Sequence, residues 1–122
     1  EIPAVGFGMG LTRVILALHQ EGIADPALPR PQLYIAALGA AAQARAVVET
    51  EALRRAGIYA ECDTMGRSLK AQMKYADKLG ARYVLMLGDS ELESGKANLR
   101  NMETSEQRPI ALAELADVFK AD

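Results

Sequence analysis

The first pattern with chemical potential is a glycine-rich segment near the start of the chain. Gly6, Gly8 and Gly10 alternate with larger residues, and Arg13 follows three positions later. On an extended strand such glycines share one face and leave a surface free of side chains, on which a flat ring could lie. Arg13, at the start of a helix, could then hold phosphate through two parallel hydrogen bonds. The pattern fits adenine and triphosphate, but glycines that merely permit close backbone packing are the alternative, and no G-x-G-x-x-G fingerprint is present.

A second pattern is a series of basic residues at helical spacing. The series consists of Arg67, Lys70, Lys74 and Lys78. Their i, i+3, i+7, i+11 spacing predicts a basic stripe on one side of a helix, opposite its apolar side. Such a stripe can follow an RNA backbone, and Tyr75, Tyr34 and Tyr59 could stack on unpaired bases. The alternative is a solvated helix face without a partner.

A third pattern is a polar turn followed by an alternating strand, in residues 88–100. Glu93 could accept hydrogen bonds from base amino groups, Asn98 could pair with base edges, and Arg100 could reach a base or a phosphate. Base edges in an unpaired loop are what sequence-specific RNA-binding modules read. The Gly-Lys pair that ends at Lys96 lacks the upstream glycine of a P-loop. A polar strand facing water is the alternative here.

Composition excludes several classes of function. The chain has 122 residues, 50% of them hydrophobic, and a net charge of −2, so RNA binding would need a local cluster of cations. The longest apolar run, residues 33–42, is about half the roughly 20 residues of a membrane helix. A single Cys62 and a single His19 argue against a disulfide and against a zinc site. We therefore expect no metal, no membrane and no DNA partner, and a cytoplasmic location.

The order of elements that must position these residues follows from periodicity. Residues 1–19 predict a glycine-rich strand and a helix with Leu11, Val14, Ile15 and Leu18 on one apolar face. Residues 20–31 contain three prolines and predict a linker. Residues 32–122 predict an α/β domain with about five strands and about three helices. The sheet should be mixed, because helical crossovers give parallel strands and a hairpin gives antiparallel ones.

The predicted strands cover residues 33–38, 58–62, 82–87, 96–102 and 107–110. The predicted helices cover residues 40–56, 68–79 and 112–119, with Ser68 as a cap and Gly80 as a C-terminal stop. On the first of these helices we expect four residues to face the sheet, namely Ala41, Ala44, Val48 and Ala52. On the second we expect Leu69, Met73, Ala76 and Leu79.

Two stretches of the sequence resemble a known family. PAVGFGMGLTR (residues 3–13) is similar to the third signature motif of class II aminoacyl-tRNA synthetases. GRSLKAQMKYADKLGARYVLMLG (residues 66–88), followed by ELESGK (residues 91–96), resembles their anticodon-binding domain in its histidyl form. Two positions depart from the motif, since Gly8 stands where alanine is more frequent and Thr12 where glutamate is usual.

The resemblance implies that two segments of the chain have different functions. Residues 1–19 would be the end of a catalytic domain, with Gly6, Gly8, Gly10 and Arg13 at its ATP. Residues 32–122 would bind the anticodon loop of tRNA(His), and the matching positions are Glu93 and Arg100, followed by Arg67, Lys70 and Lys96. The chain would then be the C-terminal part of a longer ligase that joins histidine to tRNA with ATP and magnesium, as a homodimer. By itself it should bind no cofactor and catalyse nothing.

A rival interpretation is a regulatory paralogue of the same family. The regulatory subunit of ATP phosphoribosyltransferase carries a histidyl-synthetase-like domain and does not aminoacylate tRNA. The intact Arg13 favours a working synthetase over this alternative.

Overall fold

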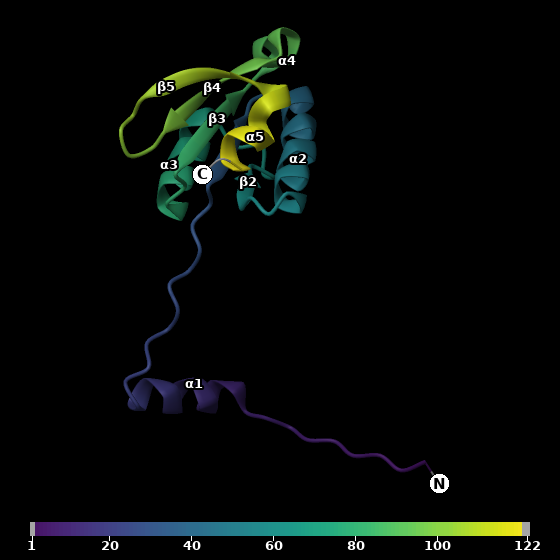
Figure 1. Ribbon diagram of the computed structural model, residues 1–122, viewed down its shortest axis with the longest axis vertical. Helices are drawn as coiled ribbons and strands as arrows, with labels where there is room; N and C mark the ends of the chain where they lie inside the picture. Colours follow the sequence, from purple (N-terminus) through teal and green to yellow (C-terminus); the bar gives the residue numbers. More distant parts are fainter. Residues whose placement is uncertain (1, 121–122) are drawn as a thin grey trace.

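The computed structural model describes residues 2–120, which form one five-stranded sheet and five α-helices (Figure 1). The strands are β1 (Leu33–Ala37), β2 (Ala60–Cys62), β3 (Tyr83–Leu87), β4 (Lys96–Asn101) and β5 (Gln107–Ala111). The helices are α1 (Leu11–Gln20), α2 (Ala40–Arg55), α3 (Leu69–Leu79), α4 (Asp89–Ser94) and α5 (Leu115–Lys120), and a 3-10 turn (Leu112–Glu114) precedes α5.

The sheet has the strand order β2-β1-β3-β4-β5. β1 pairs in parallel with β2 and β3, whereas β4 is antiparallel to both β3 and β5. The two parallel pairings follow from the crossovers through α2 and α3, and the antiparallel pair β4–β5 is a hairpin. The prediction of a mixed five-stranded sheet is confirmed.

Helices cover the two faces of the sheet unequally. α2 and α5 pack on one face with Ile35, Leu85 and Leu99, while α3 packs on the other face over Tyr34 and Val84. Figure 1 shows α2 and α3 on opposite sides of the sheet. α3 lies against β1, so the same face of β4 and β5 is left without a helix. This open face carries the residues of β4 that are not in the core.

The ends of α3 are those predicted. The Ser68 hydroxyl accepts a hydrogen bond from the Ala71 amide at 3.4 Å, and Gly80 ends the helix in the left-handed region with φ +69°. Of the four residues expected to face the sheet, Ala76 is fully buried, and Leu69, Met73 and Leu79 are partly buried around it. Gln72 shares the buried centre of this face.

The predicted inner face of α2 is wrong. Its buried residues are Ala42, Ala46, Thr50 and Leu53, whereas Ala41, Ala44, Val48 and Ala52 are exposed. Alanine occurs on nearly every side of this helix, so hydrophobic periodicity does not distinguish one face from another. The face that packs against β1 and β2 is chosen by the sheet.

Residues 88–95 do not form the predicted polar turn. Most of them form α4, which gives residues 32–120 one more helix than expected. The Glu91 carboxylate accepts a hydrogen bond from the Gly88 amide at 2.9 Å, and Gly95 ends the helix with φ +68°. An acidic residue at the third helical position that reaches back to the amide before the helix is a known N-terminal signal.

The N-terminal segment also differs from expectation. Residues 2–10 form no strand, and every residue from 2 to 30 is exposed. A β-strand needs a neighbour to pair its amides and carbonyls, and none of the described residues supplies one. α1 does form, with its predicted apolar residues Leu11, Val14, Ile15 and Leu18 exposed by 40 to 66%. Figure 1 shows α1 apart from the sheet.

Candidate nucleic-acid interface

An open groove of about 570 Å³ runs between α3 and the uncovered face of β3 and β4. We call it the α3–β4 groove. Its lining residues are Leu69, Lys70, Met73, Lys74, Met86, Arg100 and Met102. It has an apolar floor of leucine and methionine and three cations, and no carboxylate is among its lining residues. Such a lining suits a ligand with flat apolar parts and negative charge.

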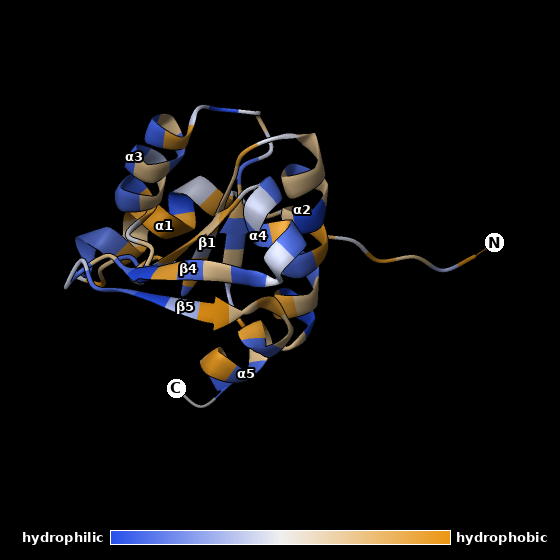
Figure 2. Ribbon diagram, turned by 90° about the horizontal axis from the view of Figure 1, so that it is seen from above, coloured by the Kyte–Doolittle hydropathy of each residue, from blue (hydrophilic) through white to orange (hydrophobic). Residues whose placement is uncertain are grey.

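The strand periodicity of β4 produces one wall of the groove. Ala97 and Leu99 are buried against α2 and α5, which forces Lys96, Asn98 and Arg100 onto the open face. The pairing with β5 places Asn98 opposite Pro109 and Arg100 opposite Gln107 on this face. In Figure 2 hydrophilic colour dominates the turn end of the β4–β5 hairpin. The alternation predicted for this strand is therefore present.

Arg100 is held in place but is not saturated with hydrogen bonds. One terminal nitrogen of its guanidinium donates weakly to the Ser105 hydroxyl at 3.4 Å. Its Nε is buried and has no acceptor within residues 2–120. The hairpin behind it is fixed, because the Asn101 side-chain oxygen accepts from the amides of Glu103 and Thr104. Within the described residues the terminal nitrogens of Arg100 make only the one weak bond to Ser105, so they can donate to an oxygen or ring nitrogen of a ligand in the groove.

Glu93 and Lys96 lie at the other end of β4 from the groove. Glu93 is exposed on α4, and Lys96 is exposed where β4 begins. Lys96 precedes Arg100 by four positions on an extended strand, which places their Cα atoms about 13 Å apart. Of the five residues predicted to contact tRNA, only Arg100 and Lys70 line the groove. A ligand that contacts Glu93 and Lys96 as well as Arg100 would have to extend along the whole of β4.

Arg67 lies on the opposite flank of α3, outside the groove. The carboxylate of Asp63 accepts a hydrogen bond from the Arg67 amide at 2.8 Å and forms an ion pair with its Nε at 3.1 Å. The guanidinium lies 4.3 Å from the centre of the Tyr75 ring. The predicted basic stripe is therefore divided by the crest of α3, with Lys70 on one side and Arg67 on the other.

Sequence reasoning missed the groups that shape both flanks. Asp63 and Gln72 are buried polar residues, and nothing in their spacing distinguishes them from solvated ones. Periodicity predicts only that Met86 and Met102 belong to strands, whereas the structure shows that both line the groove. Tyr34, which we expected to be able to stack on a base, is fully buried and cannot do so.

The glycine-rich segment forms no enclosed site among residues 2–120. A Cβ atom at Gly6 or Gly8 would meet nothing within 4 Å, and at Gly10 it would meet only the Arg13 side chain. Arg13 is exposed on α1. Their role at ATP stays a prediction.

Other chemistry finds little support in the described residues. Residues 2–120 contain no cluster of three or more potential metal ligands. His19 pairs with Asp25 at 2.9 Å, and Cys62 is a half-buried free thiol. Among these residues no helix has the length and apolar character needed to cross a membrane.

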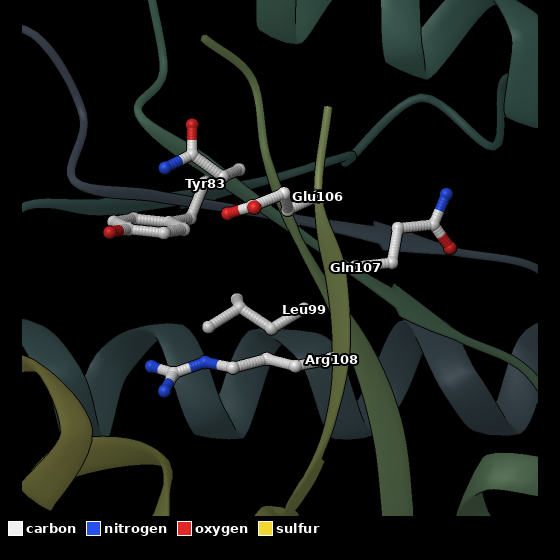
Figure 3. A pocket seen from close by; sticks show the side chains of 6 residues that line it. Tyr83, Leu99, Glu106, Gln107 and Arg108 are labelled. Atoms are coloured by element: carbon white, nitrogen blue, oxygen red, sulfur yellow. The ribbon is translucent and has the colours of Figure 1, made fainter. Parts of the chain in front are cut away.

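A second pocket, of about 530 Å³, lies on the other face of the β4–β5 hairpin (Figure 3). Tyr83, Leu99 and Arg108 point toward one side of β5, and Gln107 points away from them. Tyr83 is in edge-to-face contact with Phe119 of α5, with ring centres 5.5 Å apart. Glu106 adds a carboxylate to this pocket, which makes it less suited to an anionic ligand than the α3–β4 groove.

Comparison with known proteins assigns this arrangement to a family. Residues 32–122 match the family described as Anticodon binding domain. The chain belongs to the anticodon-binding domain family. The histidine–tRNA ligase of Acetivibrio thermocellus is 51% identical over 118 residues, which is 97% of this chain. The ligase of Halothermothrix orenii is 47% identical over 117 residues, which is 96% of this chain. The predicted resemblance to the histidyl family is confirmed.

Solved structures of two aminoacyl-tRNA synthetases share the fold. Histidyl-tRNA synthetase from S. aureus matches 90% of this chain with a TM-score of 0.75 and 40% identity. The RNA-binding domain of threonyl-tRNA synthetase from Cryptosporidium parvum matches 75% with a TM-score of 0.67 and 21% identity, which shows the fold alone. The chain spans about 28% of the length of the two ligases and of the S. aureus chain.

Proposed function

We propose that this chain is the anticodon-recognition part of a histidine–tRNA ligase and that its α3–β4 groove binds the anticodon loop of tRNA(His). The observation that carries the proposal is the groove itself, in which Arg100 lies with Lys70 and Lys74 and, within residues 2–120, donates only one weak hydrogen bond, at 3.4 Å to the Ser105 hydroxyl. A base edge or a phosphate oxygen would supply a better acceptor for its terminal nitrogens. The names of the relatives support tRNA as the partner.

Different residues of the groove can bind different parts of an unpaired loop. Met86 and Met102 offer apolar surface against which a base can pack. Arg100, and Asn98 beside it on the open face, can form hydrogen bonds with base edges, which distinguish one base from another. Lys70 and Lys74 at the rim attract the phosphates without reading the sequence.

The proposal extends to the activity of the longer protein. That protein would join histidine to tRNA with ATP and magnesium in the cytoplasm, as a homodimer. Four residues of this chain would lie at the ATP, namely Gly6, Gly8, Gly10 and Arg13. Stabilising a reaction at phosphorus takes several preorganised groups, and Arg13 would be one of them. The relatives that support this proposal are ligases, so the regulatory paralogue is not favoured.

The test is binding of the cognate anticodon stem-loop and of a stem-loop with a scrambled loop. Arg100→Ala should weaken cognate binding by about 1 to 3 kcal/mol and affect the scrambled loop much less. Glu93→Ala should do the same if Glu93 contacts a base. The matched control is Arg108→Ala, which removes the same charge from the other face of the hairpin. Equal binding of both loops by the unaltered chain would refute the proposal, and equal tightening of both by Glu93→Ala would show a merely solvated carboxylate.

A further inference from the structure

The flank of α3 that faces away from the α3–β4 groove carries a second basic pocket. Its volume is about 380 Å³, and we call it the α3 outer pocket. Its lining residues are Arg67, Ala71, Lys74, Tyr75, Asp77 and Lys78. Three lining residues are cations and one is a carboxylate, and the buried Asp63 behind Arg67 adds a second negative charge. The surroundings keep a net positive charge, which suits an anion. Lys74 lines both the groove and the outer pocket.

Arg67 is the most rigidly held cation of the outer pocket. Its partner Asp63 has a fully buried side chain, while about a third of the Arg67 side chain is exposed. The ion pair engages Nε, and the ring of Tyr75 supports one face of the guanidinium. Within residues 2–120 its two terminal nitrogens donate no hydrogen bond, because its polar contacts with Asp63 use Nε and the backbone amide. They present a planar pair of donors, the geometry that binds a phosphate in bidentate fashion.

Gln72 holds in place the loop that carries the ion pair of Asp63 and Arg67. Its amide nitrogen donates to the carbonyl of Arg67 at 2.7 Å and to the carbonyl of Ala37 at 2.8 Å. Its amide oxygen accepts from the Ala37 amide at 2.9 Å. The loop before α3 is therefore tied to β1 in the core, and Arg67 is ordered before any ligand arrives. Preorganisation of this kind lowers the entropic cost of binding.

The chemistry of the outer pocket favours a phosphate over a base. Arg67 covers one face of the Tyr75 ring, and Tyr34 meets the same ring in an edge-to-face contact with centres 6.1 Å apart. A base would have to displace the guanidinium in order to stack there. The aromatic ring thus supports an arginine that contacts the backbone, and it is not itself a platform for bases.

We propose that the α3 outer pocket binds backbone phosphates of the stem next to the anticodon loop, with Arg67 and Lys78 as contacts and Asp63 as the residue that positions Arg67. The inference rests on the proposed function. RNA seated in the groove continues across the crest of α3 at Lys74, the residue shared by the two sites. Loop and stem are thereby held on opposite flanks of one helix.

The test compares two RNA probes, the complete anticodon stem-loop and the loop sequence as a single strand. Lys78→Ala should weaken binding of the stem-loop severalfold, reduce its salt slope by about 1, and leave the single strand unchanged. The matched control is Arg55→Ala, which also removes an exposed positive charge from the last turn of a helix, but on the other face of the sheet. Lys74→Ala should weaken binding of both probes.

Arg67 and Asp63 are tested with variants that keep the fold. Arg67→Lys retains the charge but loses the planar pair of donors, and it should weaken only the stem-loop. Asp63→Asn removes the charge that orders Arg67, so adding Arg67→Lys to it should cause little further loss. Unchanged stem-loop affinity and salt slope in both Lys78→Ala and Arg67→Lys would overturn the inference, as would an equal loss for the single strand. If the unaltered chain binds neither probe, the proposed function itself is wrong.

Discussion

Arg100 and Arg67 are both half-buried arginines, yet the structure prepares them for different tasks. Arg100 has terminal nitrogens that make only one weak hydrogen bond within residues 2–120, to Ser105, so they can donate to a base edge. Arg67 has its Nε paired with Asp63 and one face of its guanidinium on the Tyr75 ring, which leaves only its terminal nitrogens as donors. The surroundings of each guanidinium, and not the residue type, separate base reading from phosphate binding.

Tyr34 provides a test at the residue scale. Burial, with a smaller contribution from the charge of Asp63, raises the pKa of its hydroxyl from 10.0 to about 12. The unfolded chain releases this proton first, so the stability that Tyr34 contributes falls as the pH rises from 10 toward 12. The Tyr34→Phe variant does not undergo this decrease. From about pH 9 to about pH 11 its free energy of unfolding should therefore rise by about 1.3 kcal/mol relative to that of the unaltered chain. Urea denaturation of both proteins at the two pH values measures the difference.

If the two proteins differ in free energy of unfolding by the same amount across this pH range, Tyr34 has an ordinary pKa. At neutral pH the substitution should change stability by less than about 1 kcal/mol, because the hydroxyl is buried without a protein partner within residues 2–120.

At the scale of elements, α3 is the organising unit of both candidate sites. Its buried centre, Gln72 and Ala76, anchors it over β1, and its two flanks line the groove and the outer pocket. The other face of the sheet carries α2 and α5. Because α3 does not reach β5, the open face of the β4–β5 hairpin is free to bind a ligand.

α1 contrasts with α3 and should be the least stable helix of the chain. It has ten residues and none of them is buried, whereas helices shorter than about 12 residues are marginal in water without packing. We expect the amides of α1 to exchange with solvent much faster than those of β3, as measured by hydrogen exchange with mass spectrometry. Equal protection of α1 and β3 would reveal that the apolar face of α1 has found a partner, such as a second copy of the chain.

At the scale of the whole molecule, recognition and chemistry occupy separate parts of the proposed ligase. Residues 32–122 match the anticodon-binding family, and the chain spans about 28% of the relatives' length. Arg13 and the glycines before it are exposed and face no further groups among residues 2–120 that could hold ATP.

We therefore predict that this chain alone does not catalyse histidine-dependent exchange of pyrophosphate into ATP. Polarising ATP requires several groups held in fixed positions, and one exposed arginine does not provide them. The measurement is exchange of labelled pyrophosphate with and without histidine. Histidine-dependent exchange above a blank would mean that the chain contains a complete site, contrary to our interpretation.

The sequence by itself determined the order of strands and helices, the mixed sheet, the caps of α3 and the alternation in β4. These depend on local periodicity and on side chains close in the sequence. The anticodon-binding resemblance also rested on motifs within single segments. The sequence did not determine which face of α2 is buried, because alanine occurs on all sides of that helix. It also did not predict the helix α4, since its capping glutamate is equally compatible with a polar turn.

Only the tertiary structure decided which functional residues act together. It placed Lys70 and Arg100 in one groove although they are far apart in the sequence, and it moved Arg67 to the opposite flank although it belongs to the same basic series. It also revealed Asp63 and Gln72 as the groups that fix Arg67. The physical reason is that burial and the pairing of strands bring distant residues together, and no local pattern records those contacts.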